Sequence, residues 1–154
     1  MRAALAAAAQ LGVPLTVVSA AGAGVHAGAG WWAAMVEAAR PTFPSVHLTA
    51  VLDCGDQPGH VLAAWRAGVA DVRFSGEGPA ADRLDAIAVS LGRRLWRELP
   101  PSIELRFRRD PVATARNWLV PDGETDHAAL QRSGSSANQA PDPATGHVKT
   151  RKKP

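Results

Sequence analysis

The sequence predicts an α/β fold in which three to four parallel strands alternate with helices. Short apolar, β-branched runs recur between helical runs, and Gly or Pro marks most of the boundaries. This alternation, repeated along residues 1–120, is typical of a parallel sheet with right-handed crossovers. Two architectures fit it: a partial (β/α)-barrel of the TIM type, and a small open layered sheet of the flavodoxin type. At 154 residues the chain is shorter than a complete barrel, which takes about 250.

The chain begins with an Ala-rich run, residues 2–10, that favours a helix. Gly12 is a suitable helix stop, and Pro14 prevents continuation. Residues 14–19 are apolar and β-branched, which indicates a buried strand. The same residues have some features of a signal peptide, but Gln10, Gly12 and Pro14 interrupt the apolar run, so a helix and a strand are preferred. A parallel fold that starts on a helix leaves two explanations open: its first strand is absent, or the true start lies upstream.

A glycine-rich loop, residues 20–30, connects this strand to a helix over residues 31–40 that ends at Pro41. The loop matches neither the P-loop nor the dinucleotide-binding pattern, so we interpret it as a flexible βα loop. The helix carries an apolar stripe at the spacing of a helix packed on a sheet, formed by Trp32, Met35, Val36 and Ala39.

The central stretch predicts a complete βαβ unit. Residues 45–52 form a nearly continuous apolar strand, residues 57–67 a helix with Asp56 as N-cap and Gly68 as stop, and residues 69–74 the next strand. Open parallel sheets and (β/α)-barrels place their sites at the carboxyl ends of strands. The candidate site therefore comprises the polar and small residues just after these strands, Asp53, Cys54, Gly55, Asp56, Ser75 and Gly76.

The C-terminal part continues with a helix over residues 79–91 and a short strand within residues 93–99. Residues 102–108 alternate apolar and charged side chains, which predicts a half-exposed edge strand. Asp110 is a good N-cap for a last helix that runs through Leu119. We therefore expect one α/β domain over residues 1–120. The remainder, residues 121–154, is polar and rich in Pro, Ser and Gly, which predicts a disordered, basic tail.

Charge and cysteine content narrow the classes of partner. Residues 1–132 carry as many Arg as Asp plus Glu, so the formal charge of +3 belongs to residues 133–154, where all three lysines lie in the last six positions; we therefore expect no nucleic-acid partner. No apolar run reaches the roughly 18 residues of a membrane-spanning helix, so no membrane partner is expected. Cys54 is the only cysteine, which excludes an intrachain disulfide and fits a cytoplasmic protein.

Residues 17–76 resemble the central part of class II fructose- and tagatose-bisphosphate aldolases. Those proteins have a strand ending in Ser, a Gly-Ala loop, and a Gly before a helix, as at Ser19, Gly22-Ala23 and Gly28. A strand ending in Leu-Asp-His-Gly follows there, then a helix ending in Ala-Gly and a strand ending in Asp-Gly or Asp-Ala. The matching positions here are Leu52-Asp53-Cys54-Gly55, Ala67-Gly68 and Ser75-Gly76.

The resemblance implies a role for Asp53 as general acid/base and for the residue after it as a zinc ligand, with zinc polarising a ketose-phosphate carbonyl. Cys54 stands where the family has His, and a thiolate also binds zinc. The family's further His ligands have no counterpart, because His127 and His147 lie in the predicted tail. A rebuilt zinc site from Cys54, His26 and His60 is conceivable. The simpler alternatives are loop capping for the two aspartates, Asp53 and Asp56, and a small buried apolar role for Cys54.

Two functional hypotheses follow. The preferred one is a non-catalytic or function-shifted aldolase-barrel-like domain without a cofactor. It would bind a small polar or phosphorylated ligand, or a partner subunit, through residues at the carboxyl ends of its strands: Ser19, Gly22, Gly28, Asp56, Ser75 and Gly76. Because a partial barrel exposes a sheet edge and an apolar face, a homodimer or a partner chain is expected.

The alternative is a small metal-dependent aldolase, a carbon–carbon lyase with Asp53 as general acid/base and Cys54 as metal ligand. Its enediolate would need a metal ion such as zinc, because residues 1–120 contain no Lys to form a Schiff base.

Overall fold

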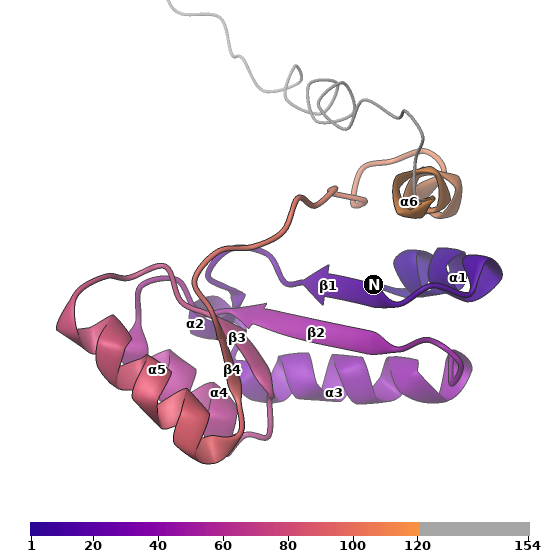
Figure 1. Ribbon diagram of the computed structural model, residues 1–154. Helices are drawn as coiled ribbons and strands as arrows, with labels where there is room; N and C mark the ends of the chain where they lie inside the picture. Colours follow the sequence, from indigo (N-terminus) through magenta and orange to yellow (C-terminus); the bar gives the residue numbers. More distant parts are fainter. Residues whose placement is uncertain (121–154) are drawn as a thin grey trace, which may run out of the picture. The chain divides into compact units, whose positions relative to one another are not determined.

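Helices and strands alternate along residues 1–120 of the computed structural model, and these are the residues that the structure describes (Figure 1). The predicted α/β class with a parallel sheet is confirmed. The tail predicted for residues 121–154 lies outside the described residues. No helix within residues 1–120 combines the length and hydropathy needed to cross a membrane.

The sheet consists of four parallel strands in the order β1-β2-β3-β4, so strands that follow one another in sequence are also neighbours in space. Their bounds are β1 Leu15–Val18, β2 Leu48–Asp53, β3 Asp71–Arg73 and β4 Arg94–Trp96. A flavodoxin-type sheet has the order 2-1-3-4-5, whereas consecutive units of a (β/α)-barrel have the order seen here. Within the described chain the sheet is open, with β1 and β4 at its edges.

Three helices, α3 (Ala29–Ala39), α4 (Pro58–Arg66) and α5 (Pro79–Leu91), lie along the same side of the sheet (Figure 1). Their apolar faces share one core with the helix-facing residues of β2 and β3. The largest members of this core are Trp32, Val36, Leu52, Val61, Trp65, Val69, Val72, Phe74 and Leu84. The predicted stripe of α3 is confirmed in part, because Trp32, Val36 and Ala39 are buried while Met35 is only partly so.

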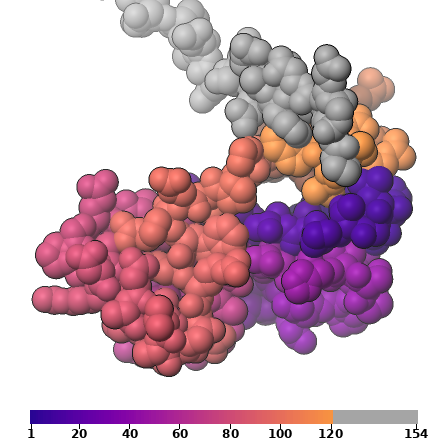
Figure 2. All heavy atoms as spheres, in the orientation of Figure 1, coloured from indigo at the N-terminus to yellow at the C-terminus, as the bar shows by residue number. Residues whose placement is uncertain are grey.

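The first and last helices pack on each other beside β1 (Figures 1 and 2). Helix α1 (Arg2–Leu11) ends at Gly12, whose φ of 66° is the left-handed conformation of a helix stop. Helix α6 (Pro111–Leu119) begins with the predicted cap, since Ala113 N donates to Asp110 Oδ1 over 2.9 Å. The buried side chains of α1, with Leu15, Ala39 and Ala115, form a second apolar cluster.

The strand predicted over residues 102–108 is wrong. The segment has no strand, and its apolar Phe107 is 86% exposed. Glu104 makes local bonds instead: its side chain accepts from Arg106 N over 2.9 Å, and its carbonyl accepts from Arg108 Nε over 3.3 Å. Local hydrogen bonds of this kind compete with the pairing of strands. An alternating pattern of apolar and charged residues is therefore not enough to form a strand.

Asp56 was also predicted wrongly as an N-cap. The cap of α4 is Gln57, which makes no capping bond through its side chain, and Asp56 instead accepts from Gln57 Nε2 over 2.7 Å. A turn closed by Gln57 N and Cys54 O, 3.3 Å apart, adds one residue before the helix begins at Pro58. The glycine-rich loop before α3 likewise contains a short helix, α2 (Ala23–His26), that was not predicted.

Candidate functional site

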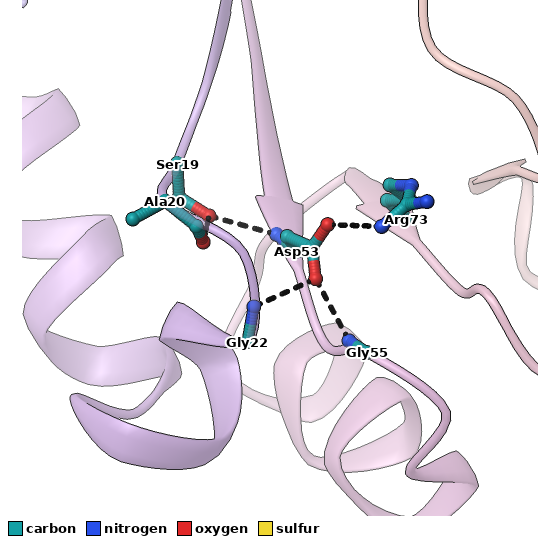
Figure 3. Close-up of polar contacts among 6 residues, drawn as sticks. All are labelled: Ser19, Ala20, Gly22, Asp53, Gly55 and Arg73. Carbon is teal, nitrogen blue, oxygen red and sulfur yellow. Dashed lines mark hydrogen bonds and ion pairs between the residues drawn. The ribbon is translucent and has the colours of Figure 1, made fainter. Parts of the chain in front are cut away.

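The carboxyl ends of β1, β2 and β3 meet around one buried carboxylate, that of Asp53 (Figure 3). Asp53 is the last residue of β2 and is 2% exposed. Alternation along the strand directs its side chain away from Leu52, and therefore away from the core under the three helices. Asp53 is the one buried charged residue of the described chain, and it lies at the carboxyl end of the sheet, where the site was predicted.

Both oxygens of the Asp53 carboxylate have partners (Figure 3). Oδ1 accepts from the backbone N–H groups of Gly22 and Gly55, each over 2.9 Å. Oδ2 forms an ion pair with Arg73 Nη1 at 2.6 Å. One side chain therefore joins the loop after β1, the loop after β2 and strand β3.

The backbone of Asp53 is tied to the first loop as well. Its N–H donates to Ser19 Oγ over 2.9 Å, and Ser19 Oγ in turn donates to Ala20 O over 3.0 Å (Figure 3). Ser19 and Gly22 therefore contact Asp53 as structural partners. A left-handed φ of 66° at Gly22 and of 58° at Gly55 lets these loops turn back toward the carboxylate.

The pKa of Asp53 reflects two opposing effects. Burial disfavours the charged form and raises the pKa, but the hydrogen bond from Gly22, the Arg73 guanidinium and the bond from Gly55 together hold the pKa below its ordinary value. Asp53 is therefore ionised at neutral pH. A carboxylate in this state has no proton to donate, and its oxygens already accept hydrogen bonds.

Cys54 points into the core. It is fully buried, and its Sγ lies close to α2, where a Cβ placed on Gly24 would come within 2.5 Å of it. Burial, with the nearby Asp53 charge, raises the pKa of the thiol to about 11. These observations match the alternative in which Cys54 is a small buried apolar residue.

The zinc site considered from Cys54, His26 and His60 is not formed. Within residues 1–120 there is no group of three His, Cys, Asp or Glu side chains placed to hold a metal ion. His26 lies instead over Gly22, where an added Cβ would sit 3.4 Å from its ring. His60 is exposed on α4.

The other predicted site residues lie around the network without contacting the Asp53 side chain. Ser75 is exposed, and its N–H donates to Gly55 O over 2.8 Å. Gly76 O accepts from Arg97 Nη2 over 2.6 Å, and a Cβ on Gly76 would meet the Phe74 ring at 2.4 Å. Asp56 is exposed, and Gly28, with φ 83°, precedes α3.

Sequence reasoning missed three residues, Arg73, Gly24 and Arg97. The sequence could have indicated a role for Arg73, because a charged residue at the end of an otherwise apolar strand needs a partner when its side chain is buried. Its partner follows from the register, which sets Arg73 beside Asp53. The contact of Gly24 with Cys54 and the bond from Arg97 to Gly76 depend on tertiary packing and left no local signal.

Over β3 and β4, the sheet face turned away from α3, α4 and α5 is polar where an apolar face was expected, whereas on β2 the same face carries the buried Val51. Trp96 Nε1 donates to Asp71 Oδ1 over 2.9 Å, and Arg94 lies 3.9 Å from the same oxygen. The register continues this pattern, with Asp71 opposite Arg94 and Arg73 opposite Trp96. A barrel interior is filled mainly by branched apolar side chains, so this face differs from one.

No family model, no curated protein and no solved structure matches the chain. The aldolase resemblance therefore stays a prediction.

Proposed function

We propose that the chain is a non-catalytic, function-shifted relative of the aldolase barrel that binds a small polar ligand at the carboxyl ends of its strands. The observation that supports this most strongly is the engagement of Asp53. A general acid/base exchanges a proton with the substrate within hydrogen-bond reach. Asp53 is 2% exposed and bonded at both oxygens, so it is suited to holding loops together.

The same reasoning weakens the metal-dependent alternative. A thiol must lose its proton to bind zinc, and burial raises the pKa of Cys54. Its neighbours in the core are apolar side chains. Ligation by Cys54 would therefore require α2 to move away from it.

The rim of the site offers donors to a ligand. Ser75 is exposed after β3, and Gly76 beside it is partly exposed, whereas both backbone polar groups of Gly55 are already hydrogen-bonded. Arg73, two residues before Ser75, keeps part of its side chain exposed. A hydroxyl and a guanidinium favour a ligand with acceptor oxygens, such as a carboxylate or a phosphate.

A small ligand is favoured over a partner subunit that would complete an apolar barrel interior. The sheet face turned away from α3, α4 and α5 carries Asp71, Arg73 and Arg94, and burying these charges against an apolar surface would be costly. A homodimer stays a prediction, which light scattering at micromolar concentration tests. Cytoplasmic localisation stays a prediction as well.

Ligand binding and metal content test the proposal together. We expect protein purified without a His-tag or chelator to contain no stoichiometric metal. A thermal-shift screen of small polar carboxylates and phosphates should identify a ligand that raises Tm by mass action. That shift should shrink in Ser75→Ala and persist in the matched control Ser90→Ala, on the exposed face of α5.

A different result would favour the lyase. Near-stoichiometric zinc that is lost in Cys54→Ser, together with cleavage of a ketose bisphosphate that is lost in Asp53→Asn, would overturn the non-catalytic proposal. The folded state of both variants would be checked by circular dichroism, because each substitution removes a buried group.

A further inference from the structure

A cavity of about 170 Å³ lies at the opposite end of the sheet from Asp53. Its walls are one side of α3, the first half of β2 and the turn that leads into β3. Its lining residue nearest to Asp53 along β2 is Ala50, three positions away, and nothing in the proposed function uses the cavity.

The floor of the cavity is formed by apolar side chains, although the surface that the cavity exposes is on the whole more polar than apolar. Trp32 and Val36 of α3 are 3% and 8% exposed, and Leu48 of β2 faces them. For scale, an apolar protein cavity of about 150 Å³ accommodates benzene. The cavity is half open to solvent, so it has room for a group of about four to six carbons but does not enclose it.

The mouth of the cavity carries two opposite charges. Glu37 lies on α3 and Arg40 is the C-cap residue of that helix; both are exposed and three positions apart, which makes them neighbours on the helix surface. Neither forms an ion pair or a hydrogen bond through its side chain within residues 1–120. The third charged lining residue, Asp71, is already engaged by Trp96 and Arg94.

We propose that this cavity binds a free α-amino acid with an apolar side chain. The side chain enters between Trp32 and Leu48, the ammonium group pairs with Glu37, and the carboxylate pairs with Arg40. A ligand with only one of the two charges leaves the other mouth residue unpaired, whereas a zwitterion complements both. A branched aliphatic side chain, as in leucine, matches the volume.

The test is isothermal titration calorimetry of the full chain with L-leucine, beside three analogues. These are 4-methylpentanoate, which lacks the ammonium group, 3-methylbutylamine, which lacks the carboxylate, and glycine, which lacks the side chain. Saturable binding of L-leucine is expected, with each analogue at least about tenfold weaker, since each loses one charge-assisted or apolar contact.

Variants assign the site. Glu37→Gln and Arg40→Gln change exposed side chains and should each weaken L-leucine binding about tenfold or more. Glu77→Gln and Arg83→Gln, at exposed positions outside the cavity, should leave it unchanged. Ala33→Leu fills part of the cavity and should abolish binding, with circular dichroism confirming that the variant is folded.

Three results would overturn the proposal: no saturable L-leucine binding up to about 10 mM, binding that survives both Glu37→Gln and Arg40→Gln, or 4-methylpentanoate that binds as tightly as L-leucine. None of them depends on the site around Asp53, so each leaves the proposed function untouched.

Discussion

The charged residues near the two ends of β2 differ in whether they have partners. At the carboxyl end, Asp53 is buried and every oxygen of its side chain has a partner. At the amino end, Glu37 and Arg40 flank a cavity with no partner in the described chain. A buried charge is retained only where its partners offset desolvation, so such a charge indicates structure. The exposed charges of Glu37 and Arg40 have no such partners, and the amino-acid site that we propose makes use of them.

The largest expected effect comes from removing the charge at the carboxyl end. Asp53→Asn should lower the free energy of unfolding by about 3 kcal/mol, because it breaks a buried ion pair and leaves Arg73 partly buried without its partner. Urea denaturation measures the change. The neighbouring exposed Asp56→Asn should stay within about 0.5 kcal/mol of the unmodified protein. Equal effects of the two substitutions would contradict the distinction between them.

The packing of α2 against Cys54 gives the next largest effect. Gly24→Ala should destabilise the protein by about 1–3 kcal/mol, because its Cβ would lie 2.5 Å from Cys54 Sγ and 3.1 Å from Asp53 O. Gly59→Ala on α4, where an added Cβ meets nothing within 4 Å, is the control. In a double-mutant cycle, Cys54→Ala should relieve part of the Gly24→Ala cost. Strict additivity would show that the two residues do not touch.

Asp56 and Asp110 both precede a helix that begins with Pro, but only Asp110 caps its helix through its side chain. Asp110→Ala should cost about 1 kcal/mol, because Asp110 caps α6 through Ala113 N. Asp56→Ala should cost close to nothing, since Asp56 bonds only to an exposed glutamine side chain. Thermal denaturation of both variants measures the difference, and a larger loss in Asp56→Ala would restore it as the cap of α4.

The smallest effect is the pH dependence above pH 4. The pKa of Asp53 is lowered in the folded state, so its contribution to stability is complete above the unfolded pKa and is lost as pH falls toward the folded pKa. Because the unfolded value is 3.8, the loss between pH 5 and pH 4 is only about 0.3 kcal/mol and steepens below that. Urea titrations at several pH values should show this slope in the unmodified protein. Asp53→Asn should reduce it, and an unchanged slope would assign the effect to other carboxyl groups.

Much of the fold could be predicted, because its signals are local. Gly12 and Gly92 mark helix ends through left-handed backbone, and the predicted helix over residues 79–91 coincides with α5. The missed strand at residues 102–108 shows the limit of this reasoning. A period-two pattern needs a neighbouring edge to pair with, and pairing is not a local property.

The site could be located from sequence but not interpreted. Position after a strand identified Asp53, since parallel strands present their carboxyl ends at one edge of the sheet. Its chemistry depended on Arg73, twenty positions away, and on backbone N–H groups that no side-chain pattern reveals. For the same reason the cavity beside Glu37 was invisible: its wall combines one helix with two strands.

The most direct test of the central claim is a titration of the Asp53 carboxyl carbon by ¹³C NMR, with Asp53→Asn used to assign the signal. If Asp53 is a structural tie between loops, it should titrate below 3.8, the ordinary pKa of an aspartate, because its partners stabilise the charged form. Titration at or above that value would mean that the carboxyl group is free of these partners in solution. In that case Asp53 would again be a candidate for acid/base chemistry.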